Sequence, residues 1–243
     1  MLAWSDPTNP LPVESADILI YAADLRAMLF DLLMSVVEKH SPRVARYIRH
    51  GALGQIPTGE SATAKMQAMN IWFQLQRLAD ENAAVRARRL AEVARGPEDV
   101  PGSVPHCLAM LEETGLSASE RAAALAQLRL APTITAHPTA AKRVTVLEIH
   151  RRIYRKLVEL EVQRWTPRER AALIEEIRGE IDLLWMTAEL RLERPSLADE
   201  VDWGLQLFRS SIFDALPQLH ETLREALPER QQIPAAQLSP DYS

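Results

Sequence analysis

The sequence has 243 residues, of which 47% are hydrophobic and 25% are charged. These proportions are ordinary for a globular protein and exclude a disordered or fibrous chain. The formal net charge of −5 argues against a general nucleic-acid-binding protein, which usually carries an excess of basic residues. The single cysteine, Cys107, excludes an intrachain disulfide framework and a cysteine-rich zinc site.

The N-terminal region carries no targeting signal, because a basic segment followed by an apolar one is absent from it. The most apolar early stretch, residues 18–37, contains Asp24, Arg26 and Asp31. Charges at this density are incompatible with a membrane span. We therefore expect a cytoplasmic protein with no membrane and no nucleic-acid partner.

The first half of the chain predicts an extended arm followed by long helices. Residues 1–14 contain three prolines and no hydrophobic periodicity, which is typical of an arm. Apolar residues then recur every three or four positions, predicting one helix from Ser15 and a second over about 61–95. Between them, Pro42 separates a short basic helix from the first long one. Proline and glycine in residues 96–105 predict a linker.

The second half predicts further helices with recognisable ends. A short helix from Pro105 is expected to stop at Gly115, and Ser117 with Glu120 forms a capping box for the next one. Apolar periodicity predicts a helix over about 146–160. The sequence Thr166-Pro167-Arg168-Glu169 then marks the start of another helix, which ends before Pro195. A last helix is expected from Ser196 to about Leu216.

Residues 132–136 form the one segment that predicts a β-strand, because it is short, β-branched and bounded by prolines. A lone strand cannot satisfy its own backbone hydrogen bonds. Either this peptide is a buried loop or its partner strands lie outside the chain. The prediction for residues 15–243 is thus a mainly α chain.

The segment PTITAHPTAAKRVT, residues 132–145, is the strongest candidate for chemistry. His137 follows the predicted strand, Thr139 is a suitable N-cap, and Lys142 and Arg143 fall in the first turn of the next helix. Cations are unfavourable at a helix N-terminus, so their presence there indicates an anion site, with phosphate as the obvious candidate. The alternative is a turn histidine beside a solvated basic face.

Other residues give weaker signals. His150 stands among Arg151, Arg152 and Arg155, which indicates a solvated basic face, and Trp72 and Trp185 fall on apolar stripes typical of a core. The stripe of Ile177, Ile181 and Leu184 must also pack on something. Exposed positions are expected for the histidines His40, His50 and His220 and for the acids Glu175, Glu176 and Glu180, with no metal site among them.

The sequence Thr135-Ala136-His137-Pro138-Thr139 resembles the TAHPT signature of phosphoenolpyruvate carboxylase. Segments 65–89, 143–154 and 183–219 are similar to further blocks of that family, in the same order. The last block resembles the family's W-x-T-D-E-I-R stretch and the residues after it. Its matching positions are Trp185, Thr187, Glu189, Arg191, Pro195, Asp199, Glu200 and Gly204.

This resemblance implies a fold and a reaction. The chain would be the helical N-terminal portion of a (β/α)₈-barrel enzyme, contributing the first barrel strand at 132–136. The full-length enzyme would use Mg²⁺ or Mn²⁺, held by ligands outside this chain, to form oxaloacetate and phosphate from phosphoenolpyruvate and bicarbonate. His137 would accept the carboxyl proton of carboxyphosphate, and Arg143 would support the phosphate side. A homo-oligomer, a tetramer by family analogy, is also implied.

Three positions depart from the family pattern. Ala140 replaces the Glu that usually follows TAHPT, Val144 replaces the second arginine of R-R-T, and Ala188 replaces the Asp of W-x-T-D-E. They leave open an alternative, a non-catalytic helical module that uses the same scaffold for protein contacts. With either function, we expect residues 1–243 by themselves to be inactive.

Overall fold

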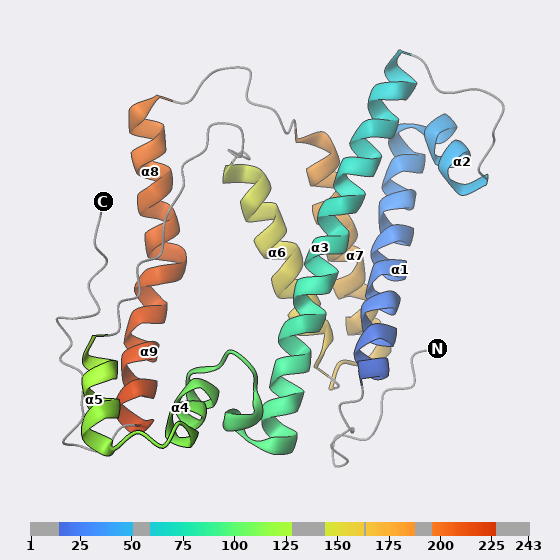
Figure 1. Cartoon of the computed structure of the whole chain (residues 1–243). Helices are drawn as coiled ribbons and strands as arrows, with labels where there is room; N and C mark the ends of the chain where they lie inside the picture. Colours follow the sequence, from blue (N-terminus) through green and yellow to red (C-terminus); the bar gives the residue numbers. More distant parts are fainter. Residues whose placement is uncertain (1–14, 51–58, 128–143, 163, 188–195, 227–243) are drawn as a thin grey trace. The chain divides into compact units, whose positions relative to one another are not determined.

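The computed structural model describes residues 15–50, 59–127, 144–162, 164–187 and 196–226 (Figure 1). All regular secondary structure within these ranges is helical, which confirms the mainly α prediction. The predicted arm at 1–14 and the predicted strand at 132–136 lie outside the described residues. No described helix combines the length and the apolar character that crossing a membrane would require.

The chain divides into two compact units, and the first comprises Met1–Leu90 and Lys142–Arg191. Its long helices form a bundle, and a short helix packs beside the first of them. The helices of this unit are α1 (Ser15–His40), α2 (Pro42–His50), α3 (Glu60–Arg95, whose last residues belong to the second unit), α6 (Val144–Leu160) and α7 (Pro167–Met186).

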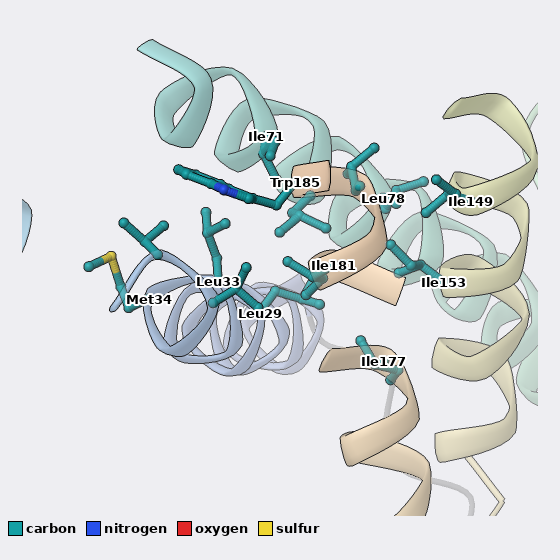
Figure 2. Close-up of a cluster of buried hydrophobic side chains, with 14 of the residues drawn as sticks. Leu29, Leu33, Met34, Ile71, Leu78, Ile149, Ile153, Ile177, Ile181 and Trp185 are labelled. Atoms are coloured by element: carbon teal, nitrogen blue, oxygen red, sulfur yellow. The ribbon is translucent and has the colours of Figure 1, made fainter. Parts of the chain in front are cut away.

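The bundle has a closed hydrophobic core built from the predicted stripes. Leu29 and Leu33 of α1, Ile153 of α6, and Ile177 and Ile181 of α7 are at most 1% exposed. Figure 2 shows side chains from α1, α3, α6 and α7 converging in this cluster. Burying each such side chain contributes about 1.5–3 kcal/mol of transfer free energy. The α7 stripe therefore packs within the bundle itself.

Polar side chains close the end of the bundle where α6 runs into α7. Tyr21 donates to Asn82 Oδ1 at 2.9 Å, and Asn82 Nδ2 donates to Glu161 Oε1 at 2.8 Å. Burial, reinforced by the charge of Glu161, raises the pKa of Tyr21 to about 12. Asn82 is 1% exposed, although the second half of α3 reads as a solvent-facing surface in the sequence.

Two helix starts predicted from capping boxes are confirmed. Thr166 accepts from the Glu169 N–H, and the Glu169 carboxylate accepts from the Thr166 N–H at 2.8 Å. Ser117 and Glu120 make the same reciprocal pair at the start of α5. These bonds satisfy backbone donors that the helix cannot pair internally, and they lower the pKa of both glutamates.

The second unit comprises Ala91–Ala141 and Leu192–Ser243. Its described elements are the 3₁₀ turn η1 (Pro97–Asp99), α4 (Val104–Glu113), α5 (Ala118–Ala126), α8 (Leu197–Leu207), the π-helical segment η2 (Phe208–Ile212) and α9 (Phe213–Ala226). η1 and the start of α4 occupy the stretch predicted to be a linker. Gly115 follows α4 with a φ of 74°, as expected for a residue that ends a helix.

The prediction that the last helix ends near Leu216 is wrong. The helical path continues through η2 and α9 to Ala226, with Pro217 inside α9. Pro217 is the fifth residue of α9, immediately downstream of the widened π turn. Because a π-helical segment already interrupts the regular α-helical hydrogen bonding, the missing N–H of a nearby proline does not terminate the helix.

Candidate functional site

The two residues predicted to carry the chemistry, His137 and Arg143, lie outside the described residues, as do Ala140 and Ala188. The structure describes the helices next to them in the chain. Val144 is the first residue of α6, so this helix begins directly after Arg143. Its first turn contains no acidic residue. The described part of the candidate site is therefore the start of α6 and the helices that hold it in place.

Ion pairs fix the register between α6 and α7. Arg152 donates to both carboxylate oxygens of Glu180 at 2.9 Å, and Lys156 pairs with Glu176. From Arg152 to Lys156 the chain advances four residues along α6, whereas their partners, Glu180 and Glu176, run four residues backward along α7. The two helices are therefore antiparallel. The same register places the first turn of α6 beside the last turn of α7, and both lie at the upper end of the bundle in Figure 1.

The start of α6, which follows the TAHPT segment in the chain, and the end of α7, which contains Trp185, therefore lie at one end of the bundle. The ends of α1 and α3 reach the same place: His40, the last residue of α1, contacts α7, and Gln67 near the start of α3 does so too. We call this region, comprising Lys39, His40, Gln67, Asp182 and Trp185, the motif end of the bundle.

Trp185 is buried, as its apolar stripe predicts, and is 8% exposed. Figure 2 shows its indole between Ile71 of α3 and Leu33 of α1. The imidazole of His40 stacks on this indole with ring centroids 6.0 Å apart. His40 is exposed, as predicted, but its ring also contacts the tryptophan on one side and a carboxylate of α7.

That carboxylate belongs to Asp182, one turn before Trp185. Its Oδ2 accepts from Lys39 Nζ at 2.7 Å, and its Oδ1 is 2.5 Å from His40 Nε2. The hydrogen bond from Lys39, and then that from His40, holds the pKa of Asp182 below its ordinary value. The cluster joins the end of α1 to the last turns of α7 and places the Lys39 ammonium where a helix C-terminus favours a positive charge.

Three hydrogen bonds satisfy backbone carbonyl groups in the last turn of α7. The Thr187 hydroxyl donates to the Leu183 carbonyl at 2.7 Å, and the Thr187 N–H donates to the Leu184 carbonyl. The Trp185 carbonyl accepts from Gln67 Nε2 at 2.6 Å. Carbonyls at a helix end lack intrahelical partners, so these bonds determine where α7 ends.

His150 is also placed differently from the prediction. It is partly buried, and its Nε2 lies 2.6 Å from Gln74 Oε1 on α3. A carbonyl oxygen can only accept, so His150 Nε2 carries the hydrogen. The basic character of its neighbours suggested a solvated face, but that face turns toward α3 at this position.

Three glutamates of α7 form ion pairs with basic residues instead of clustering with one another. Glu175 bonds Arg178, Glu176 pairs with Lys156 and Glu180 with Arg152. Among the residues that the structure describes, no three His, Cys, Asp or Glu side chains are arranged to hold a metal ion.

Sequence reasoning missed Gln67, Gln74, His40, Lys39 and Asp182. Their partners are distant in the chain, so nothing local reveals the contacts. One signal was available: Gln67, Gln74 and Asn82 are polar residues at seven- and eight-residue spacing on the apolar side of α3. Polar groups in such positions need partners from neighbouring helices.

The geometry of the described residues defines an all-α bundle in which α6 begins at the end where α7 finishes. A family model for phosphoenolpyruvate carboxylase matches residues 33–241. Several curated proteins named phosphoenolpyruvate carboxylase are similar. The one from Methylorubrum extorquens is 43% identical over 84% of this chain and 22% of its own length. Those from Rhodothermus marinus and Chromobacterium violaceum are 32% identical over 67% and 69% of this chain, and 17% and 19% of their own lengths.

The chain therefore belongs to the phosphoenolpyruvate carboxylase family. It spans about a fifth of the length of the curated relatives it matches.

Proposed function

We propose that this chain is the N-terminal portion of a phosphoenolpyruvate carboxylase, which forms oxaloacetate and phosphate from phosphoenolpyruvate and bicarbonate. The observation that carries the proposal is an intact Thr135-Ala136-His137-Pro138-Thr139 signature inside a family match that covers residues 33–241. The helix α6, which begins at Val144 shortly after this signature, supports it, because the sequence predicts a helix after the signature.

His137 is the proposed proton acceptor. Phosphoryl transfer to bicarbonate yields carboxyphosphate and the enolate of pyruvate. His137 then takes the carboxyl proton, carbon dioxide and phosphate separate, and the enolate attacks the carbon dioxide. Imidazole suits this step because its unperturbed pKa of about 6.5 lets it accept and return a proton near neutrality. Arg143, just before α6, is proposed to support the phosphate side.

A divalent cation, Mg²⁺ or Mn²⁺, belongs to the proposed full-length enzyme. The described residues do not fit it, because no cluster of three suitable ligands exists among them. The ligands are accordingly proposed outside this chain, and no step above depends on them. By analogy with the family, we also propose a cytoplasmic homotetramer.

A second function is favoured by specific residues. Ala140, Val144 and Ala188 replace three charged residues of the family pattern, and the bundle has its own closed core. A non-catalytic helical module that serves protein contacts would need neither the charges nor the metal. The two proposals differ in one measurable respect, bicarbonate-dependent formation of oxaloacetate.

The test is an assay of the product of the complete reading frame, whatever its length. Purified protein is incubated with phosphoenolpyruvate, bicarbonate and Mg²⁺, and oxaloacetate is followed by coupling to malate dehydrogenase. Bicarbonate-dependent oxidation of NADH is expected. If a reading frame that contains the remaining family segments gives a folded protein without this activity, the carboxylase proposal is wrong and the module is favoured.

A further inference from the structure

Two glutamines on one face of α3 reach the two helices that flank the candidate catalytic segment. Gln67 Nε2 donates to the Trp185 carbonyl of α7 at 2.6 Å. Gln74, two turns further along α3, accepts from His150 Nε2 of α6 at 2.6 Å. The first contact is in the last turn of α7 and the second is in the second turn of α6, and α6 begins at the end of the bundle where α7 ends (Figure 1).

The two contacts act on the parts of α6 and α7 nearest the family motifs. His150 lies fewer than two turns from the start of α6, which follows Arg143 directly. Trp185 lies in the last turn of α7 and opens the block that continues through Glu189 and Arg191. A helix is stiff, so holding these turns fixes the first turn of α6 and the last turn of α7.

Burial makes these contacts expensive to break. Gln74 is 7% exposed, and Trp185, whose carbonyl accepts from Gln67, is 8% exposed. Leaving such a group without a partner costs the desolvation of that group. Their chemistry is also opposite: at these contacts Gln67 acts as a donor and Gln74 as an acceptor.

We propose that Gln67 and Gln74 are positioning residues for the reaction, which hold the last turn of α7 and the second turn of α6, the helix that follows the segment with His137 in the chain. This inference rests on the proposed carboxylase function. Neither glutamine is assigned contact with substrate. Their effect passes through the Trp185 carbonyl and the His150 imidazole.

The opposite hydrogen-bonding roles give a crossed test in the complete enzyme. Gln67→Glu preserves size but removes the donor, whereas Gln67→Lys keeps one. Gln74→Lys removes the acceptor, whereas Gln74→Glu keeps it. We expect kcat to fall about ten- to hundredfold in Gln67→Glu and Gln74→Lys, with KM for phosphoenolpyruvate within about twofold of wild type. Gln67→Lys and Gln74→Glu are expected to retain most of the kcat.

Asn82→Ala is the matched control. Asn82 lies on the same side of α3 and is buried, but it bonds Tyr21 and Glu161 at the opposite end of the bundle. If Gln67, Gln74 and Asn82 served only to stabilise the fold, replacing any one of them would lower kcat to a similar extent. We instead expect Asn82→Ala to lower the melting temperature while kcat, measured well below that temperature, stays unchanged.

Hydrogen exchange of the 243-residue chain separates this inference from the function on which it rests. In Gln67→Glu, amides of residues 184–195 are expected to exchange faster, while exchange in α1 stays as in wild type. Wild-type kcat in both Gln67→Glu and Gln74→Lys, or kcat lost equally in Asn82→Ala, would overturn the inference. If wild type forms no oxaloacetate, the proposed function fails, and unchanged exchange at 184–195 would then overturn the positioning role as well.

Discussion

The imidazole of His40 and the indole of Trp185 stack with their planes inclined by 17°. His40 ends α1, and Trp185 lies in the last turn of α7. Asp182 adds hydrogen bonds from Lys39 and His40 one turn earlier. The end of α7 is thus held from α1 by its side chains and from α3 by its backbone carbonyl.

Replacing Asp182 by Asn is expected to destabilise the chain by about 1 kcal/mol at pH 7, because Asn carries no negative charge and has one acceptor oxygen, so it cannot keep both the bond from Lys39 and the contact with His40. The pKa of Asp182 is lowered in the folded state. Its contribution is therefore present above the unfolded pKa of about 3.9 and lost as the pH falls through the folded value. Urea unfolding of both proteins at pH 7 and at pH 3 measures this. An equal stability gap at both pH values would contradict it.

Replacing Ile181 by Ala is expected to cost about 2–5 kcal/mol of unfolding free energy, because the side chain is fully buried and the cavity cannot collapse completely. Leu183 provides the control on the same helix, since it is 46% exposed. Leu183→Ala should change stability by about 0.5 kcal/mol or less. Chemical denaturation of both variants decides the matter, and similar losses would show that the α7 stripe is not the core of the bundle.

The isolated chain is expected to bind a hydrophobic dye or to self-associate through the outward face of α3. Met66, Met69 and Phe73 are exposed at helical spacing on the side opposite the core. Changing all three to Gln should reduce dye fluorescence and sharpen the size-exclusion peak. Arg88→Gln, an exposed change on the same helix, should do neither. A dye-negative monomeric wild type would contradict the prediction and favour the stand-alone module.

Residues 1–243 by themselves are expected to form no oxaloacetate. The described residues offer no metal-binding cluster, and the chain spans only about a fifth of its relatives. The check is the assay coupled to malate dehydrogenase, with an active carboxylase added to a parallel sample to verify the coupling. Bicarbonate-dependent turnover by the purified chain would show that the site is complete within it.

Replacing His137 by Asn in the full-length enzyme is expected to spare the release of phosphate while reducing the formation of oxaloacetate. The amide is similar in size but cannot take up a proton at neutral pH. Bicarbonate-dependent release of phosphate should continue and leave pyruvate, while oxaloacetate formation falls by about 10²–10⁴. Both products are measured side by side on wild type and variant.

Two other results for His137→Asn would correct the assignment. Unchanged oxaloacetate formation would make His137 a structural turn residue. Equal loss of both products would place it in substrate binding or in phosphoryl transfer.

The helices themselves followed from local sequence. Apolar side chains at three- and four-residue spacing mark one face of each helix whatever surrounds it, so α3 was predicted at 61–95 and lies at 60–95. The starts at Ser117 and Thr166 were predictable for the same reason, because each capping bond joins residues three positions apart. The TAHPT signature and the further similar blocks at 65–89, 143–154 and 183–219 are also readable in the sequence, and together they pointed to the family that the comparisons show.

The motif end of the bundle was decided by tertiary structure. His40, His150 and Glu180 all look like solvated polar residues in the sequence, yet each meets a partner on another helix. Gln67 and Trp185 come together only because α3 and α7 share a core. Whether a polar side chain faces water or a neighbouring helix depends on which faces those helices bury, and that is set by packing the whole bundle rather than by any local spacing.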